Sequence, residues 1–227
     1  MTVEFEWVGN VGVARMNSGE NRFNPTSLGA LHAILGEIEA RPEPSAFVLT
    51  GSDKFFSNGL DLDRFGTHPE ELVPSVEQLA ALLGRLLVLP AYCVGALNGH
   101  AFAGGGILSL AFDWRVMRSD RGYLCLNEID LKMPFTEQLF AGMSAQVPRP
   151  SLVQAMLTGA RYGAEEALAL GLVNETASGD EVLERALARA TAMADKGGSI
   201  MGSHKRNLFG DHARRAGWNP SSDTSNS

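Results

Sequence analysis

Hydrophobic and polar residues alternate at the start of the chain and then repeat at helical spacing. Residues 3–8 and 11–16 predict two strands, joined by a turn at Gly9-Asn10. A helix is expected to follow as far as residue 40, with Asn24 as its cap and Pro25 as its first residue. Its apolar positions recur every three or four residues: Leu28, Leu31, Ile34, Leu35 and Ile38. Residues 46–50 then predict a buried strand.

The same patterns continue through the rest of the chain. A long helix is predicted over residues 74–89, ended by Pro90, followed by a strand over residues 92–97. After a glycine cluster we expect a helix to about residue 112, and short strands over 115–117 and 123–126. The last third is helical, with candidates at 136–145, 150–157, 164–170 and 180–194. Gly171 and Gly197 are expected to end or interrupt helices.

Strands separated by helices indicate an α/β fold with a mainly parallel sheet and right-handed crossovers. The chain has 227 residues and contains neither a linker between two cores nor an internal repeat. We therefore expect one large domain. Residues 221–227 are polar, and we expect them to be frayed.

Charge and cysteine content narrow the possible partners. The chain has 19 Lys and Arg against 26 Asp and Glu, a net charge of −7, which argues against non-specific nucleic-acid binding. Cys93 and Cys125 lie in apolar runs, so we expect buried free thiols. No run is long enough to span a membrane, Glu4 and Glu6 interrupt any secretory signal, and the end is not Ser-Lys-Leu. The expected location is the cytoplasm.

Two glycine turns follow predicted strands. Gly99 and Gly104-Gly105-Gly106 match neither a P-loop nor a dinucleotide fingerprint. The earlier turn follows residues 46–50 and reaches Gly59-Leu60. Two such turns on one sheet could aim two backbone N–H groups at a single oxygen, as an oxyanion hole does. The alternative is that both turns are only structural.

Three segments carry a family resemblance: F-F-S-N-G-L-D-L, N-G-H-A-F-A-G-G-G and N-E-I-D-L. Together they resemble the crotonase superfamily, which comprises enoyl-CoA hydratases and isomerases, and the similarity runs from about residue 11 to 173. The resemblance implies a spiral of ββα units as a core over residues 1–175. It also implies a C-terminal helical region over residues 176–227 that assembles a homotrimer, sometimes paired into a hexamer.

The resemblance further implies an acyl-CoA thioester substrate, whose carbonyl oxygen would lie between the N–H groups of Leu60 and Gly104. Coenzyme A is then part of the substrate, and no separate cofactor is expected. Hydratases of the family carry two glutamates, but the first position here is Ile107 and only the second, Glu128, is acidic. Delta isomerases of the family likewise have an apolar residue at the first position and a glutamate at the second. We therefore predict that Glu128 alone moves the double bond of a 3-enoyl-CoA to position 2.

An apolar neighbourhood of Ile107, Leu108 and Phe135 is expected to raise the pKa of Glu128. Asp130 is the fallback base, because in a strand it would share the face of Glu128. Hydration of 2-enoyl-CoA, another crotonase-type reaction, and non-catalytic acyl-CoA binding remain alternatives. The residues expected to bind substrate are Arg22, Phe23, Ser57, Asn58, Gly59, Asp61, Gly105 and Ile107.

Further residues are candidates for binding the rest of the substrate. Cations that could hold the nucleotide end of the substrate are Arg22, Lys54, Arg64, Lys205 and Arg206. Phe23 and Phe56 could border the adenine or the pantetheine arm, although core packing is an equal alternative. Asp61 is expected to cap a helix. His32 and His100 lack metal-ligand spacing, so no metal is assigned, but a polar role for His100 in the pocket stays open.

Overall fold

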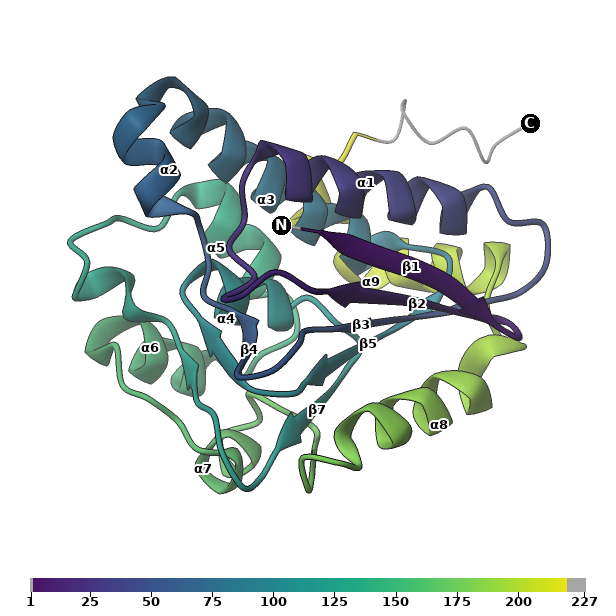
Figure 1. The fold of residues 1–227 in the computed structure, drawn as a ribbon. Helices are drawn as coiled ribbons and strands as arrows, with labels where there is room; N and C mark the ends of the chain where they lie inside the picture. Colours follow the sequence, from purple (N-terminus) through teal and green to yellow (C-terminus); the bar gives the residue numbers. More distant parts are fainter. Residues whose placement is uncertain (1, 220–227) are drawn as a thin grey trace.

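The structure is a computed structural model and describes residues 2–219 (Figure 1). Within this part of the chain, a six-stranded sheet has the order β1-β2-β3-β5-β7-β9. β1 pairs antiparallel with β2, and every later pair in this sheet is parallel. The strands are β1 (Val3–Val8), β2 (Val11–Met16), β3 (Ala46–Thr50), β5 (Tyr92–Leu97), β7 (Trp114–Arg118) and β9 (Glu175–Ala177).

A second, smaller sheet carries the glycine turns. It consists of β4 (Phe55–Ser57), β6 (His100–Phe102) and β8 (Leu124–Cys125), which run parallel in that order. β4 and β6 lie in segments that the sequence predicted only as loops around glycines. Both strands are three residues long, too short for period-two alternation to reveal them.

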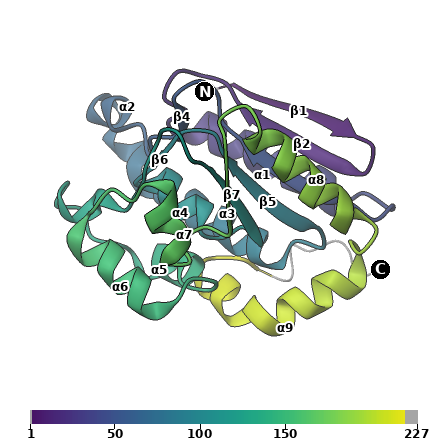
Figure 2. The same ribbon diagram turned by 90° about the horizontal axis from the view of Figure 1, so that it is seen from below.

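Helices cover both faces of the large sheet, with α8 on one face and α1 and α3 on the other (Figures 1 and 2). Successive side chains of a strand point to opposite faces. In β3, Phe47 and Leu49 therefore join the cluster that contains α1 (Pro25–Glu39) and α3 (Leu72–Val88), whereas Val48 packs against α8 (Val182–Ala194). A strand buried on both faces explains why residues 46–49 are continuously apolar.

Among the remaining helices, α4 (Gly104–Ser109) packs against β4 and β6 of the small sheet. α9 packs along α3 and also contacts α5. The α-helices are α2 (Leu62–Thr67), α4 (Gly104–Ser109), α5 (Glu137–Met143), α6 (Arg149–Thr158), α7 (Ala164–Ala169) and α9 (Ser199–Arg215). Two short 3₁₀ helices, η1 (Pro69–Glu71) and η2 (Asn127–Ile129), complete the set in residues 2–219.

The predicted α/β class with a mainly parallel sheet is confirmed, and so are the strands over residues 3–8, 11–16, 46–50 and 92–97. The helix expected to reach residue 112 was too long, because α4 ends at Ser109. The division at residue 175 stays a prediction; that residue begins β9, which pairs with β7. The tail expected to fray, residues 221–227, lies outside the described residues. No helix within residues 2–219 combines the length and apolar character needed to cross a membrane.

Candidate active site

The two glycine turns contact each other. β4 leads into Gly59-Leu60, and β6 leads into Ala103-Gly104 at the start of α4. A Cβ atom on Gly59 would lie 2.8 Å from the Gly104 nitrogen and 3.0 Å from Ala103 Cβ. Gly59 also has a φ of +80°, which favours glycine. The close approach therefore requires glycine and brings the backbone N–H groups of Leu60 and Gly104 to one place.

Both N–H groups are available as donors. Among the hydrogen bonds of residues 2–219, neither the Leu60 nor the Gly104 N–H donates to another protein group. Phe23 holds the first turn by pairing with it through backbone hydrogen bonds to Gly59 and Asp61, at 2.7 and 2.9 Å. Ala103 precedes Gly104 with φ 46° and ψ −124°, a conformation that alanine adopts only under strain. Leu60 and Gly104, whose N–H groups have no partner among the described residues, thus border one cavity.

An apolar cavity of about 300 Å³ opens beside these donors. Leu60 and Gly104 line it together with Ile107 and Glu128. The rest of its wall comes mainly from α2, α3 and the segment that leads into α5: Leu62, Val76, Leu79, Leu131, Met133, Pro134, Phe135, Thr136 and Leu139. The Ile107 and Phe135 surroundings predicted for Glu128 are confirmed, whereas Leu108 is buried behind this wall.

Glu128 is the buried acid of this cavity. It lies in η2, directly after β8, and is 7% exposed. Its Oε2 atom is buried and accepts no hydrogen bond from residues 2–219. Burial away from water disfavours the charged carboxylate and raises the pKa of Glu128 from 4.5 to about 7. The side chain can therefore hold or release a proton near neutral pH.

Asn127, next to Glu128, is a site residue that the sequence reasoning missed. It lines the cavity, and its Oδ1 atom is buried without a hydrogen-bond partner among the described residues. A buried amide without a partner is costly in a purely structural position. In the sequence, the only indication of this role was that Asn127 is adjacent to Glu128, the proposed base.

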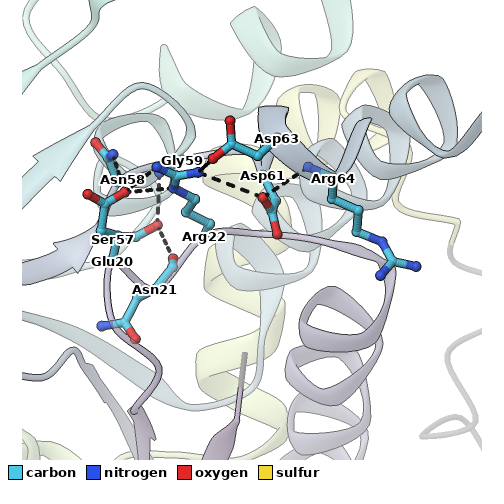
Figure 3. A network of polar contacts seen from close by, with 9 residues as sticks. All are labelled: Glu20, Asn21, Arg22, Ser57, Asn58, Gly59, Asp61, Asp63 and Arg64. Atoms are coloured by element: carbon cyan, nitrogen blue, oxygen red, sulfur yellow. Dashed lines mark hydrogen bonds and ion pairs between the residues drawn. The ribbon is translucent and has the colours of Figure 1, made fainter. Parts of the chain in front are cut away.

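The mouth of the cavity holds a network of charged side chains (Figure 3). Arg22 donates to Glu20 and to Asp63, and its Nη1 atom lies 3.9 Å from Asp61. The hydrogen bonds that Arg22 donates to Asp63 and Glu20 raise the pKa of its guanidinium. Glu20 also accepts a 3.0 Å hydrogen bond from Asn58, which itself lines the cavity.

Other predicted substrate residues act through the backbone or through packing. The side chains of Phe23 and Phe56 are fully buried in the core, so they do not border the cavity. Ser57 donates to the Asn21 carbonyl and accepts from the Gly59 N–H, which fixes the first turn. A Cβ on Gly105 would lie 2.3 Å from the Ser57 carbonyl oxygen, so Gly105 permits contact between the turns. Asp61 caps α2, as predicted, by accepting from the Arg64 N–H.

The structure does not bring the other proposed cations to the cavity. Arg64 forms an ion pair with Glu71, and Lys205 is buried against Asp113. Lys54 and Arg206 do not line the cavity either.

Two further candidates, Asp130 and His100, lie outside the cavity. Asp130 does not share a strand face with Glu128, because residues 127–129 form η2, and Asp130 is exposed outside the cavity. His100 packs among Phe55, Phe102 and Tyr123 on the small sheet, so it has no polar role in the pocket. His32 contacts α3 through the Gln78 carbonyl. No cluster of three metal-ligating side chains occurs in residues 2–219.

Comparisons with known proteins identify the family. The family model described as enoyl-CoA hydratase/isomerase matches residues 8–216. "Enoyl-CoA delta isomerase 1, peroxisomal" from Arabidopsis thaliana is 33% identical over 84% of this chain and 82% of its own length. A putative enoyl-CoA hydratase from Thermus thermophilus is 36% identical over 82% of this chain and 75% of its own length.

A solved structure from the same family has a similar fold. The apo structure of an enoyl-CoA isomerase from Mycobacterium tuberculosis superposes with a TM-score of 0.86, at 26% identity. The superposition covers 94% of this chain and 93% of the isomerase chain. With the two glycine turns, the cavity and the matching fold, the chain belongs to the enoyl-CoA hydratase/isomerase family.

Proposed function

We propose that the protein moves the double bond of a 3-enoyl-CoA to position 2, with Glu128 as the single acid and base. The observation that carries the proposal is a buried carboxylate without a partner at Oε2, in one apolar cavity with two available N–H donors. The delta isomerase names of the Arabidopsis relatives, at 30–33% identity, support the same reaction.

The reaction needs one base and one oxyanion site. Glu128 removes a proton from C2, the C2–H bond electrons enter the conjugated system, and negative charge collects on the thioester oxygen. The N–H groups of Leu60 and Gly104 stabilise this charge, each contributing about 3 kcal/mol. The same Glu128 then returns the proton to C4, which leaves the double bond between C2 and C3.

The walls of the cavity favour isomerisation over hydration. Adding water requires one group that activates the water and another that handles the carbon proton. Ile107 occupies the wall near the glycine turn and supplies no acid. A carboxyl group with a pKa near 7 is suited to taking and returning one proton at neutral pH.

Replacing Glu128 by Gln tests the proposal. We expect Glu128→Gln to lower kcat for a 3-enoyl-CoA by roughly 10²–10⁴-fold, as loss of general acid–base catalysis does. Asp130→Asn is the matched control, because Asp130 is exposed outside the cavity, and it should retain full turnover. Unchanged isomerisation in Glu128→Gln would refute the assignment.

Hydration of a 2-enoyl-CoA is the second candidate. It is favoured by the hydratase name of the Thermus relative and by Asn127, whose buried Oδ1 could accept a hydrogen bond from a water molecule. Incubating 2- and 3-enoyl-CoA esters in deuterated water separates the two reactions. Isomerisation places deuterium at C2 or C4, whereas hydration gives a hydroxyl product. Tight ester binding with neither product would favour a non-catalytic acyl-CoA-binding protein.

A homotrimer or hexamer, a location in the cytoplasm, and the absence of nucleic-acid and membrane partners stay predictions. Each follows from the family resemblance or from composition, and sedimentation and cell fractionation would test the first two.

A further inference from the structure

Arg22 is the only cationic side chain that lines the cavity within residues 2–219. It also lines a neighbouring surface hollow with Ser18, Glu20, Asn24 and Asp61, so both spaces share this side chain. Any phosphate carried by a ligand that leaves the cavity on this side would meet this guanidinium first.

The Arg22 guanidinium is already occupied by carboxylates. Its Nε and Nη2 atoms lie 2.7 and 2.6 Å from Glu20 Oε2, and its Nη1 atom pairs with Asp63. With Asp61 at 3.9 Å, one positive charge faces three negative charges. The mouth thus has an excess of negative charge, which disfavours an anionic ligand.

The two direct partners of Arg22 differ in how firmly they are held. Glu20 also binds Asn58, so it belongs to a network that spans two loops. The Asp63 side chain is 86% exposed and has Arg22 as its only hydrogen-bond partner among the described residues. An exposed ion pair is weak, and a guanidinium can bind phosphate through two parallel hydrogen bonds. Asp63 is therefore the partner that a phosphate would displace.

We propose that Asp63 determines substrate specificity by competing with the phosphate groups of the thioester's carrier for Arg22. This inference rests on the proposed function, since it takes a coenzyme A thioester as the ligand. Asp63 weakens binding of phosphate-bearing thioesters and leaves phosphate-free thioesters unaffected. It does not contact the reacting atoms, so it acts on binding and not on the chemical step.

The test compares two substrates that share one acyl group: the coenzyme A ester and the N-acetylcysteamine thioester, which has no phosphate. Asp63→Asn should lower KM for the coenzyme A ester by about two- to fivefold, the range expected for an exposed ion pair. Its kcat should not change, nor should KM for the phosphate-free thioester. The gain should shrink as salt is added, because exposed charges are screened.

Two controls sharpen the experiment. Glu165→Gln removes one exposed negative charge on α7, away from the cavity, and should change neither KM. Asp63→Asn in an Arg22→Met background should give no further gain, because the competing guanidinium is gone. An unchanged or higher KM for the coenzyme A ester, or an equal fall for both substrates, would overturn the inference.

Failure of the proposed function gives a different result. If no enoyl thioester reacts, calorimetry with coenzyme A and with pantetheine still measures the competition. Asp63→Asn should then bind coenzyme A more tightly than the unchanged protein does, with equal affinity for pantetheine. Equal coenzyme A affinities in the two proteins would reject the role of Asp63, whatever reaction the protein catalyses.

Discussion

Two residues beside the cavity differ from their counterparts in a free peptide, one in its backbone conformation and the other in its pKa. Ala103 has a positive φ just before Gly104, the second proposed oxyanion donor, and Glu128 has a raised pKa inside an apolar cavity. Each state is unfavourable in isolation and persists because the surrounding packing fixes it. Strain and desolvation at one site are typical of a functional centre.

The raised pKa of Glu128 sets the pH dependence of the reaction. The base must be deprotonated to accept a proton from C2, so kcat/KM for a 3-enoyl-CoA should rise with pH and level off above about pH 7. Initial rates from pH 5 to 9 would show this. A profile that levels off near pH 4.5 would mean that the carboxylate is hydrated and not desolvated.

The same carboxylate should destabilise the protein in its charged form. Folding raises the pKa of Glu128, so the folded state holds the proton more tightly between about pH 4.5 and 7. Stability is therefore lost as pH rises through this window. Glu128→Gln should increase the free energy of unfolding by up to about 3 kcal/mol at pH 8, and by little at pH 4.5. Urea denaturation at both pH values measures the difference, and equal differences would contradict the argument.

Backbone strain at Ala103 gives a second stability prediction. Ala103→Gly should stabilise the fold by about 1 kcal/mol, because glycine accepts φ 46°, ψ −124° without the strain of a Cβ atom. Ala101→Gly is the matched control, since Ala101 is buried in β6 and its replacement should destabilise. Thermal melts of both variants test this, and a lower Tm for Ala103→Gly would reject it.

Much of the site was predictable from the sequence. The glycine turns fix Leu60 and Gly104 because only glycine allows the contact at Gly59, and the acid at residue 128 follows from its motif. The partners of the surface cations were not predictable. Lys205 is buried beside Asp113, 92 positions away, and a pairing over such a distance leaves no local pattern.

At the scale of elements, α9 is attached to the large sheet by a buried ion pair. Lys205 Nζ lies 2.7 Å from Asp113 Oδ2, just before β7, and donates to the Ala91 carbonyl at 3.2 Å. Asp113 also accepts the Cys93 N–H at 2.8 Å. Helical periodicity did not single out residues 199–215, which were expected to be helical only as part of the C-terminal region that the family resemblance implies over residues 176–227. Their apolar periodicity is weak, and tertiary contacts with α3 hold the helix.

Breaking this ion pair should loosen α9. Lys205→Met is expected to cost about 3–5 kcal/mol in the free energy of unfolding, since it leaves the Asp113 carboxylate buried without its cation. Lys196→Met, at an exposed lysine just after α8, should cost almost nothing. Urea titrations measure both. If Lys205→Met costs no more than Lys196→Met, the pair contributes little to stability.

At the scale of the whole molecule, apolar side chains remain exposed on α9. Ile200 and Leu208 are 70% and 69% exposed, and they lie eight residues apart, on one side of the helix. This is the region for which the family resemblance predicts assembly into trimers. Assembly depends on contacts between chains, and the pattern of a single chain indicates such contacts only as an unsatisfied apolar face.

Charged substitutions on this face test the predicted trimer. Ile200→Glu combined with Leu208→Glu should reduce the mass measured by light scattering from that of a trimer to that of a monomer, because buried unpaired carboxylates oppose association. Val8→Glu, at an exposed position of β1, should leave the mass unchanged. A trimer that persists in the double variant would place the interface elsewhere.

The contact between Gly59 and Gly104 means that neither proposed oxyanion donor can be shifted without displacing the other. No larger side chain can replace glycine at this contact, so this side of the cavity cannot be reshaped by substitution. Leu131 and residues 133–136 also line the cavity, and this wall belongs to no helix or strand. Redesign for a different acyl group should therefore begin on that wall, where the shape of the chamber can change while the chemistry stays intact.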